Sequence, residues 1–190
     1  MIWEVEIRPK GRDPLRDDAI ANYHLLTHRD DGTSVFAAAS RGYLLEGPVA
    51  ADHIRSLVEM LLVDPIVEEA VVSSLQESNP AIGHTLTVLL KPGVMDPTAQ
   101  SVLEVARRLD FALDAVRTFR RYRLGSLEHL EIVKRIVAND AIEQCILGPL
   151  NTEHLSLGRP YTFRRITVPL REASDETLLR LSREGQLALN

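Results

Sequence analysis

The stretch LLKPGVMDPTAQSVLEVARRL, Leu89 to Leu109, decides how this sequence folds. It predicts the end of a β-strand, a turn and then an amphipathic helix. Asp96 is a favoured N-cap, and Pro97 suits the first helical position because its missing N–H would have no partner there. Apolar residues then recur at helical spacing, at Val102, Val105, Ala106 and Leu109.

A similar phrase, IRPKGRDPLRDDAIANYHLL, runs from Ile7 to Leu26 near the N-terminus. The residues before it alternate between apolar and charged, which is typical of a half-buried strand. Asp13 and Pro14 repeat the N-cap and the first helical residue. An apolar stripe follows, at Leu15, Ala19, Tyr23 and Leu26.

Three pairs of short motifs recur in the same order, separated by 83, 79 and 75 residues. They are Asp13-Pro14 with Asp96-Pro97, Arg41-x-Tyr43-x-Leu45 with Arg120-x-Tyr122-x-Leu124, and Asp64-x-x-Val67-Glu68 with Asn139-x-x-Ile142-Glu143. The three motifs keep their order while the segments between them differ in length. This is typical of a duplicated unit whose loops have changed. We therefore expect an α+β protein of two tandem repeats, residues 1–76 and 84–150, with antiparallel sheets paired as a pseudo-dimer and residues 76–83 as the connector.

The remaining segments complete this outline. Residues 35–47, VFAAASRGYLLEG, predict a strand, or a bent pair of strands broken near Gly42. Residues 161–170 predict a further strand, and Ser174 or Asp175 predicts the N-cap of a last helix. The chain then stops directly after an apolar stretch, which we interpret as a cut within a longer protein.

Bulk composition narrows the classes of function. The 190 residues are 45% hydrophobic and 26% charged, as in ordinary soluble domains, and the formal net charge is −5. This acidic balance gives no reason to expect nucleic acid or an anionic membrane as a partner. No apolar run approaches the roughly 20 residues that span a bilayer. A single cysteine, Cys145, fits a reducing compartment, so we expect a cytoplasmic protein.

Motifs for chemistry are missing from the sequence. It has neither G-x-x-x-x-G-K-[ST] nor G-x-G-x-x-G, the two phosphate-binding glycine patterns. Cys145 lies between apolar residues in a predicted strand, which favours a buried structural thiol over a nucleophile. His24 and His28 are four residues apart, but they lie at a predicted helix end, where polar residues are common. We expect no catalytic, cofactor-binding or metal-binding residue in this chain.

The densest charge cluster is a candidate interface. In a strand, Arg117, Phe119, Arg121 and Arg123 share one face. Three interpretations are open: a protein interface, a solvated sheet face, or a strand that binds RNA. We expect contact with protein or with the other repeat, because the arginines repel one another and an acidic chain contains the carboxylates to screen them.

Several of these motifs together resemble the PurS family. They are Lys91-Pro92-Gly93-Val94-Met95-Asp96-Pro97, Val116-Arg117 through Tyr122, and Ala138-Asn139 with Ile142-Glu143. The first repeat departs from the pattern, since RPKGRDP displaces the glycine of KPGVMDP. PurS is the small subunit of phosphoribosylformylglycinamidine synthase, and two tandem units resemble the N-terminal region of fused forms of that enzyme. Residues 151–190 resemble the start of the linker that follows.

The resemblance implies a fold and a role. The fold is a pair of small βαβ-type units related to ferredoxin-like domains. The role is non-catalytic: PurS bridges the synthetase and glutaminase subunits in purine biosynthesis. The complete enzyme uses ATP, Mg²⁺ and glutamine, while this chain is expected to bind no cofactor, no nucleic acid and no membrane. An alternative is a tandem ferredoxin-like regulatory module that binds a small molecule between its halves.

Overall fold

The computed structural model describes residues 1–75, 84–151, 155, 165, 170–171 and 173–185. The chain divides into two units, Met1–Gly158 and Arg159–Asn190, and each is treated by itself. The connector expected at 76–83 lies outside the described residues, as does most of the strand expected at 161–170. In the second unit a single helix is described, α6 (Asp175–Glu184), and Ser174 is its N-cap, as the sequence predicted.

The first unit contains the same succession of strands and helices twice. The first half comprises β1 (Ile2–Pro9), α1 (Pro14–Thr27), α2 (Gly32–Val35), β2 (Phe36–Glu46), α3 (Ala51–Leu57), the π-helix η1 (Val58–Leu62) and β3 (Glu68–Ser74). The second comprises β4 (His84–Leu90), α4 (Pro97–Arg108), β5 (Ala115–Leu124), α5 (Leu130–Val137) and β6 (Glu143–Leu147). Apart from α2 and η1, each element of one half has a counterpart in the other.

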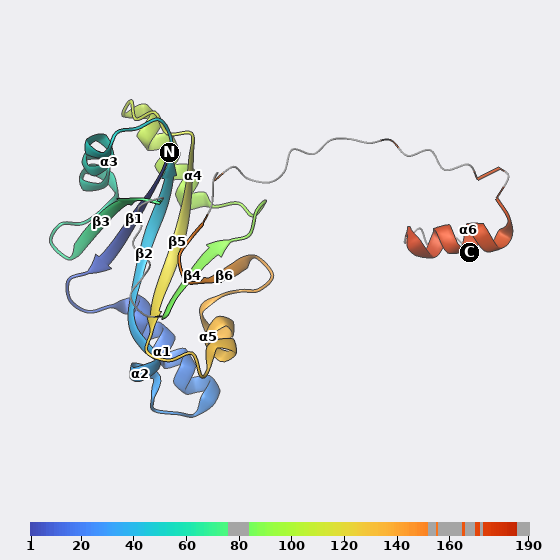
Figure 1. The fold of residues 1–190 in the computed structure, drawn as a ribbon, viewed down its shortest axis with the longest axis horizontal. Helices are drawn as coiled ribbons and strands as arrows, with labels where there is room; N and C mark the ends of the chain where they lie inside the picture. Colours follow the sequence, from blue (N-terminus) through green and yellow to red (C-terminus); the bar gives the residue numbers. More distant parts are fainter. Residues whose placement is uncertain (76–83, 152–154, 156–164, 166–169, 172, 186–190) are drawn as a thin grey trace. The chain divides into compact units, whose positions relative to one another are not determined.

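All six strands form one antiparallel sheet in the order β3-β1-β2-β5-β4-β6, which confirms the α+β class (Figure 1). β2 and β5 pair at the centre and join the halves. Arg41 lies opposite Arg120, and Tyr43 opposite Thr118. Because Arg41 and Arg120 are also matched in sequence, a pseudo-two-fold axis passes between them.

The two Asp-Pro motifs make matching hydrogen bonds. Asp13 and Asp96 each accept a hydrogen bond from the amide three residues on, at 3.0 and 2.9 Å, and so cap α1 and α4. The second carboxylate oxygen of Asp13 accepts from the amide of Ala39 at 2.8 Å. The corresponding oxygen of Asp96 accepts from the amide of Thr118 at 2.9 Å. Each aspartate therefore fixes its helix to the central strand of its own half.

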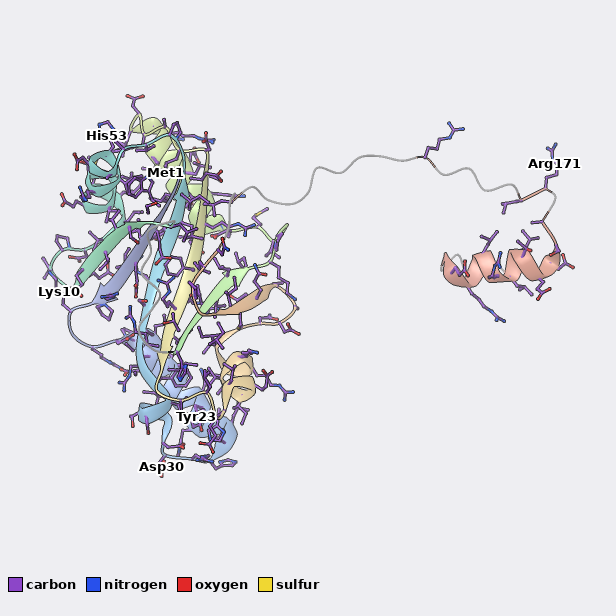
Figure 2. The ribbon with its side chains drawn as sticks, in the orientation of Figure 1. Met1, Lys10, Tyr23, Asp30, His53 and Arg171 are labelled. Carbon is purple, nitrogen blue, oxygen red and sulfur yellow. The ribbon has the colours of Figure 1, made fainter. Side chains whose placement is uncertain are left out.

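The helices of the first unit pack on one face of the sheet and divide it into two apolar clusters. At one end lie α1, α2 and α5, and at the other α3 and α4 (Figure 1). Tyr23, fully buried, lies in the α1 end, and His53 marks the α3 end (Figure 2). Since each cluster combines a helix of the first half with a helix of the second, neither half has a core of its own.

Of the two alternatives for residues 35–47, the structure has the single strand. β2 continues through Gly42 without a break, because a residue without a side chain lets Phe119 pack against the strand. A Cβ at Gly42 would lie 2.3 Å from the Cζ atom of Phe119 and 2.3 Å from the carbonyl oxygen of Val5. The expectation that Leu26 belongs to the apolar stripe of α1 was wrong. Leu26 is 63% exposed, because Tyr23 already closes the cluster against the ring of Phe36.

Candidate functional site

The four residues of the candidate interface lie side by side on β5, on the face of the sheet opposite the helices. They do not form an open surface. Phe119 is 3% exposed, and the guanidinium carbon of Arg121 lies 4.7 Å from the centre of its ring. Arg121 itself is 8% exposed. The cluster therefore contributes to the interior on this face, and only Arg117 and Arg123 are partly accessible.

Arg121 is neutralised by two glutamates of β1. Its Nη1 and Nη2 atoms donate to the two carboxylate oxygens of Glu4 at 2.6 and 3.0 Å, which is the bidentate geometry that Arg–carboxylate pairs favour. Nη1 also lies 3.4 Å from Glu6, and Nε donates to the hydroxyl of Thr87 at 3.1 Å. Burial would lower the pKa of Arg121, but the hydrogen bonds and charges of Glu4 and Glu6 raise it.

Glu6 is the centre of this network. Its carboxylate accepts hydrogen bonds from Arg8 at 3.0 Å, from the hydroxyl of Ser40 at 2.8 Å and from Arg123 at 2.8 Å. Burial alone would raise its pKa. The hydrogen bonds from Arg8 and Ser40, with the charges of Arg123 and Arg121, outweigh burial and lower the pKa of Glu6 to about 2. Glu6 is thus ionised at any physiological pH.

The network joins the two halves of the chain. β1 and β5 are not neighbours, because β2 lies between them, and Arg121 reaches Glu4 across that strand and 117 residues of sequence. Buried ion pairs of this kind fix one arrangement of the elements that they join. The expected acidic partners of the arginines are therefore in the same chain, and they belong to the other half.

Arg117 differs from its neighbours. Within the part of the chain that the structure describes, its side chain makes no hydrogen bond and no ion pair. It lies at the rim of a pocket of about 360 Å³ between α4 and the start of β5. The matching place in the first half, beside α1 and the start of β2, is lined by charged residues, including Arg12, Arg16 and Arg123.

The residues weighed for chemistry take ordinary structural positions. Nδ1 of His24 lies 3.0 Å from Asp30, and His28 ends α1 in the left-handed conformation with φ of 56°. Cys145 packs against the cluster around Tyr122, and burial raises the pKa of its thiol. Among the described residues no three His, Cys, Asp or Glu side chains are grouped to hold a metal ion. None of the described helices is long and apolar enough to cross a membrane.

Comparison with protein-family models finds no match, and neither does comparison with curated proteins. Sequence reasoning found the arginines but not Glu4 and Glu6 as their partners. The signal was present, since both glutamates lie on the charged face of an alternating strand, but only the strand order brings that face within reach of β5.

Proposed function

We propose that this chain is a non-catalytic assembly subunit, or the N-terminal region, of phosphoribosylformylglycinamidine synthase. In this role it bridges the synthetase and the glutaminase in purine biosynthesis. The proposal begins from the PurS resemblance, which rests on the turn and cap around Asp96, the arginine-rich strand and the Asn139 to Glu143 segment. ATP, Mg²⁺ and glutamine would act in the partner domains.

One structural observation supports it most. Two units of the same strand-helix succession are joined through their central strands into one sheet, with helices of each half completing the core of the other. A family whose members work in pairs is expected to give this arrangement when two copies are fused. The Arg121–Glu4 contact adds a buried ion pair between the two halves of the chain.

A regulatory module that binds a small molecule between its halves is the second candidate. A pocket of about 210 Å³ lies at the pseudo-two-fold axis, lined by Arg41, Tyr43, Arg120 and Glu143 among others. Ligand pockets usually measure about 300–1,000 Å³. Both arginines here already pair with glutamates, so the pocket offers little free charge to a ligand. The assembly role is therefore preferred.

Co-purification tests the proposal. The tagged 190-residue chain is mixed with the purified synthetase and glutaminase of the same organism and analysed by size-exclusion chromatography with light scattering. We expect a complex that contains all three proteins. Elution of this chain apart from both partners, at micromolar concentrations and with glutamine and ATP present, would reject the assembly role.

A further inference from the structure

The two central strands each leave a short free edge next to a helix N-terminus. β4 pairs with β5 only as far as Leu89, opposite Phe119, so residues 115–118 extend beyond it (Figure 1). The amide of Thr118 on this edge is taken by Asp96. Backbone groups of alternate residues in a strand point to the same side, so Val116 presents its N–H and C=O on the same free edge.

In the first half this edge is already satisfied. Phe36 lies opposite Leu124, as Val116 lies opposite Leu45, so Phe36 and Val116 correspond by their ladder partners, although the register of β2 shifts between Phe36 and Ala38. Nε of Arg16 donates to the carbonyl oxygen of Phe36 at 2.7 Å. The guanidinium thus serves as a built-in donor for this carbonyl. The pocket of about 430 Å³ that remains beside α1 is lined mainly by charged residues, Arg16 among them.

In the second half the donor is missing. Arg16 is three residues after the capping Asp13, and the residue three after Asp96 is Ala99, which has no group to donate. No described side chain donates a hydrogen bond to the Val116 carbonyl, and the pocket of about 360 Å³ lies where the guanidinium would be. Most of its exposed wall is apolar, from Leu90, Val94, Ala99, Leu103 and Leu155. Glu46, Asp96 and Asp114 also line it, so an acidic residue of a ligand is favourable only next to Arg117.

We propose that this pocket binds an extended segment of another protein, which adds as a short strand to the free edge of β5. A strand supplies the backbone N–H that the Val116 carbonyl lacks and accepts from the Val116 amide. One of its apolar side chains fills the pocket beside Ala99. An aspartate or glutamate nearby pairs with Arg117, the arginine of the cluster that has no partner within the described residues. This inference goes beyond the proposed function and does not depend on it.

A random decapeptide library displayed on phage tests the site with the 190-residue chain as bait. We expect enriched peptides to combine an apolar anchor with a neighbouring acidic residue, and we measure their affinity by fluorescence anisotropy. Ala99→Arg restores the arrangement of the first half and is expected to weaken binding at least about tenfold. Arg117→Glu is expected to lower the affinity for the acidic peptides by a similar factor. Ala21→Arg, on the exposed part of α1, is the matched control and leaves affinity unchanged.

Amide hydrogen exchange gives a second readout, which keeps the test decisive if Ala99→Arg fails to fold. Binding by strand addition slows exchange of the Val116 amide in the unmodified protein. The proposal is overturned by any of three results: no peptide enriched over the Ala99→Arg bait, equal affinity for folded Ala99→Arg and the parent, or protection confined to the edge strands β3 and β6.

Discussion

Arg41 and Arg120 lie directly opposite each other at the centre of the sheet, and each is the sequence counterpart of the other. Like charges at opposite cross-strand positions repel. Here each guanidinium pairs with a glutamate on the edge strand of its own half, Arg41 with Glu68 at 2.9 Å and Arg120 with Glu143 at 2.5 Å. The two ion pairs thus take the same form in both halves, and each connects a central strand to the edge strand of its half.

The buried pair between Arg121 and Glu4 is expected to be important for stability. Arg121→Met leaves the buried carboxylate of Glu4 without its bidentate partner, which should lower the free energy of unfolding by about 3–5 kcal/mol in urea titrations. Arg117→Met removes the same charge from the same strand without breaking a described ion pair. It should change the free energy of unfolding by no more than about 0.5 kcal/mol. Equal losses of unfolding free energy in the two variants would show that the ion pairs of Arg121 do not stabilise the fold.

Glu6 is expected to make stability depend on acid pH. Its pKa of about 2 in the folded chain lies below the ordinary 4.5, so its contribution is present above about pH 5 and is lost as the pH falls toward 2. Glu6→Gln cannot titrate. Thermal unfolding should therefore find the variant less stable than the parent at pH 7, with the difference shrinking as the pH is lowered. A difference that stays constant from pH 7 to pH 2.5 contradicts this assignment.

Gly42 is expected to tolerate no side chain. A methyl group there would overlap both Phe119 and the carbonyl oxygen of Val5, so Gly42→Ala should cost about 2 kcal/mol or more, or abolish folding. Gly11→Ala is the control, because nothing lies within 4 Å of its added Cβ. Circular dichroism during thermal unfolding distinguishes them. An unchanged melting temperature for Gly42→Ala would mean that the central strands separate easily.

The two capping aspartates are expected to be energetically equivalent. Asp13→Ala and Asp96→Ala each remove a helix cap and a bond to the central strand, and each should cost about 2 kcal/mol in urea unfolding. Asp52→Ala removes an exposed carboxylate paired only with Arg55, and should cost less than about 0.5 kcal/mol. A large cost for one aspartate and none for the other would mean that the two caps have diverged in role.

Local signals predicted most of the elements because local chemistry determines them. The Asp-Pro caps placed the starts of α1 and α4, and alternation placed β1. The sequence pattern was less informative where a contact between residues far apart in the chain determines the local structure. Gly42 left open whether residues 35–47 form one strand or two, whereas the ring of Phe119, 77 positions later, is what requires the glycine.

The candidate site was predictable only in part for the same reason. The arginine face of β5 follows from a period of two, but its partners depend on β1 lying two strands away. The free edge at Val116 depends on where β4 stops and on the absence of a guanidinium at Ala99. Neither feature follows from a local pattern, because each depends on how the strands and helices of the two halves pack together.

The central claim is that this chain connects glutamine hydrolysis to the synthetase. The most direct measurement is the rate of formylglycinamidine ribonucleotide formation by purified synthetase and glutaminase, with and without the 190-residue chain. With glutamine as nitrogen donor, we expect product formation to depend on the chain. With a high concentration of ammonium chloride in place of glutamine, the synthetase should work without it. A glutamine-dependent rate that is the same with and without the chain would contradict the account.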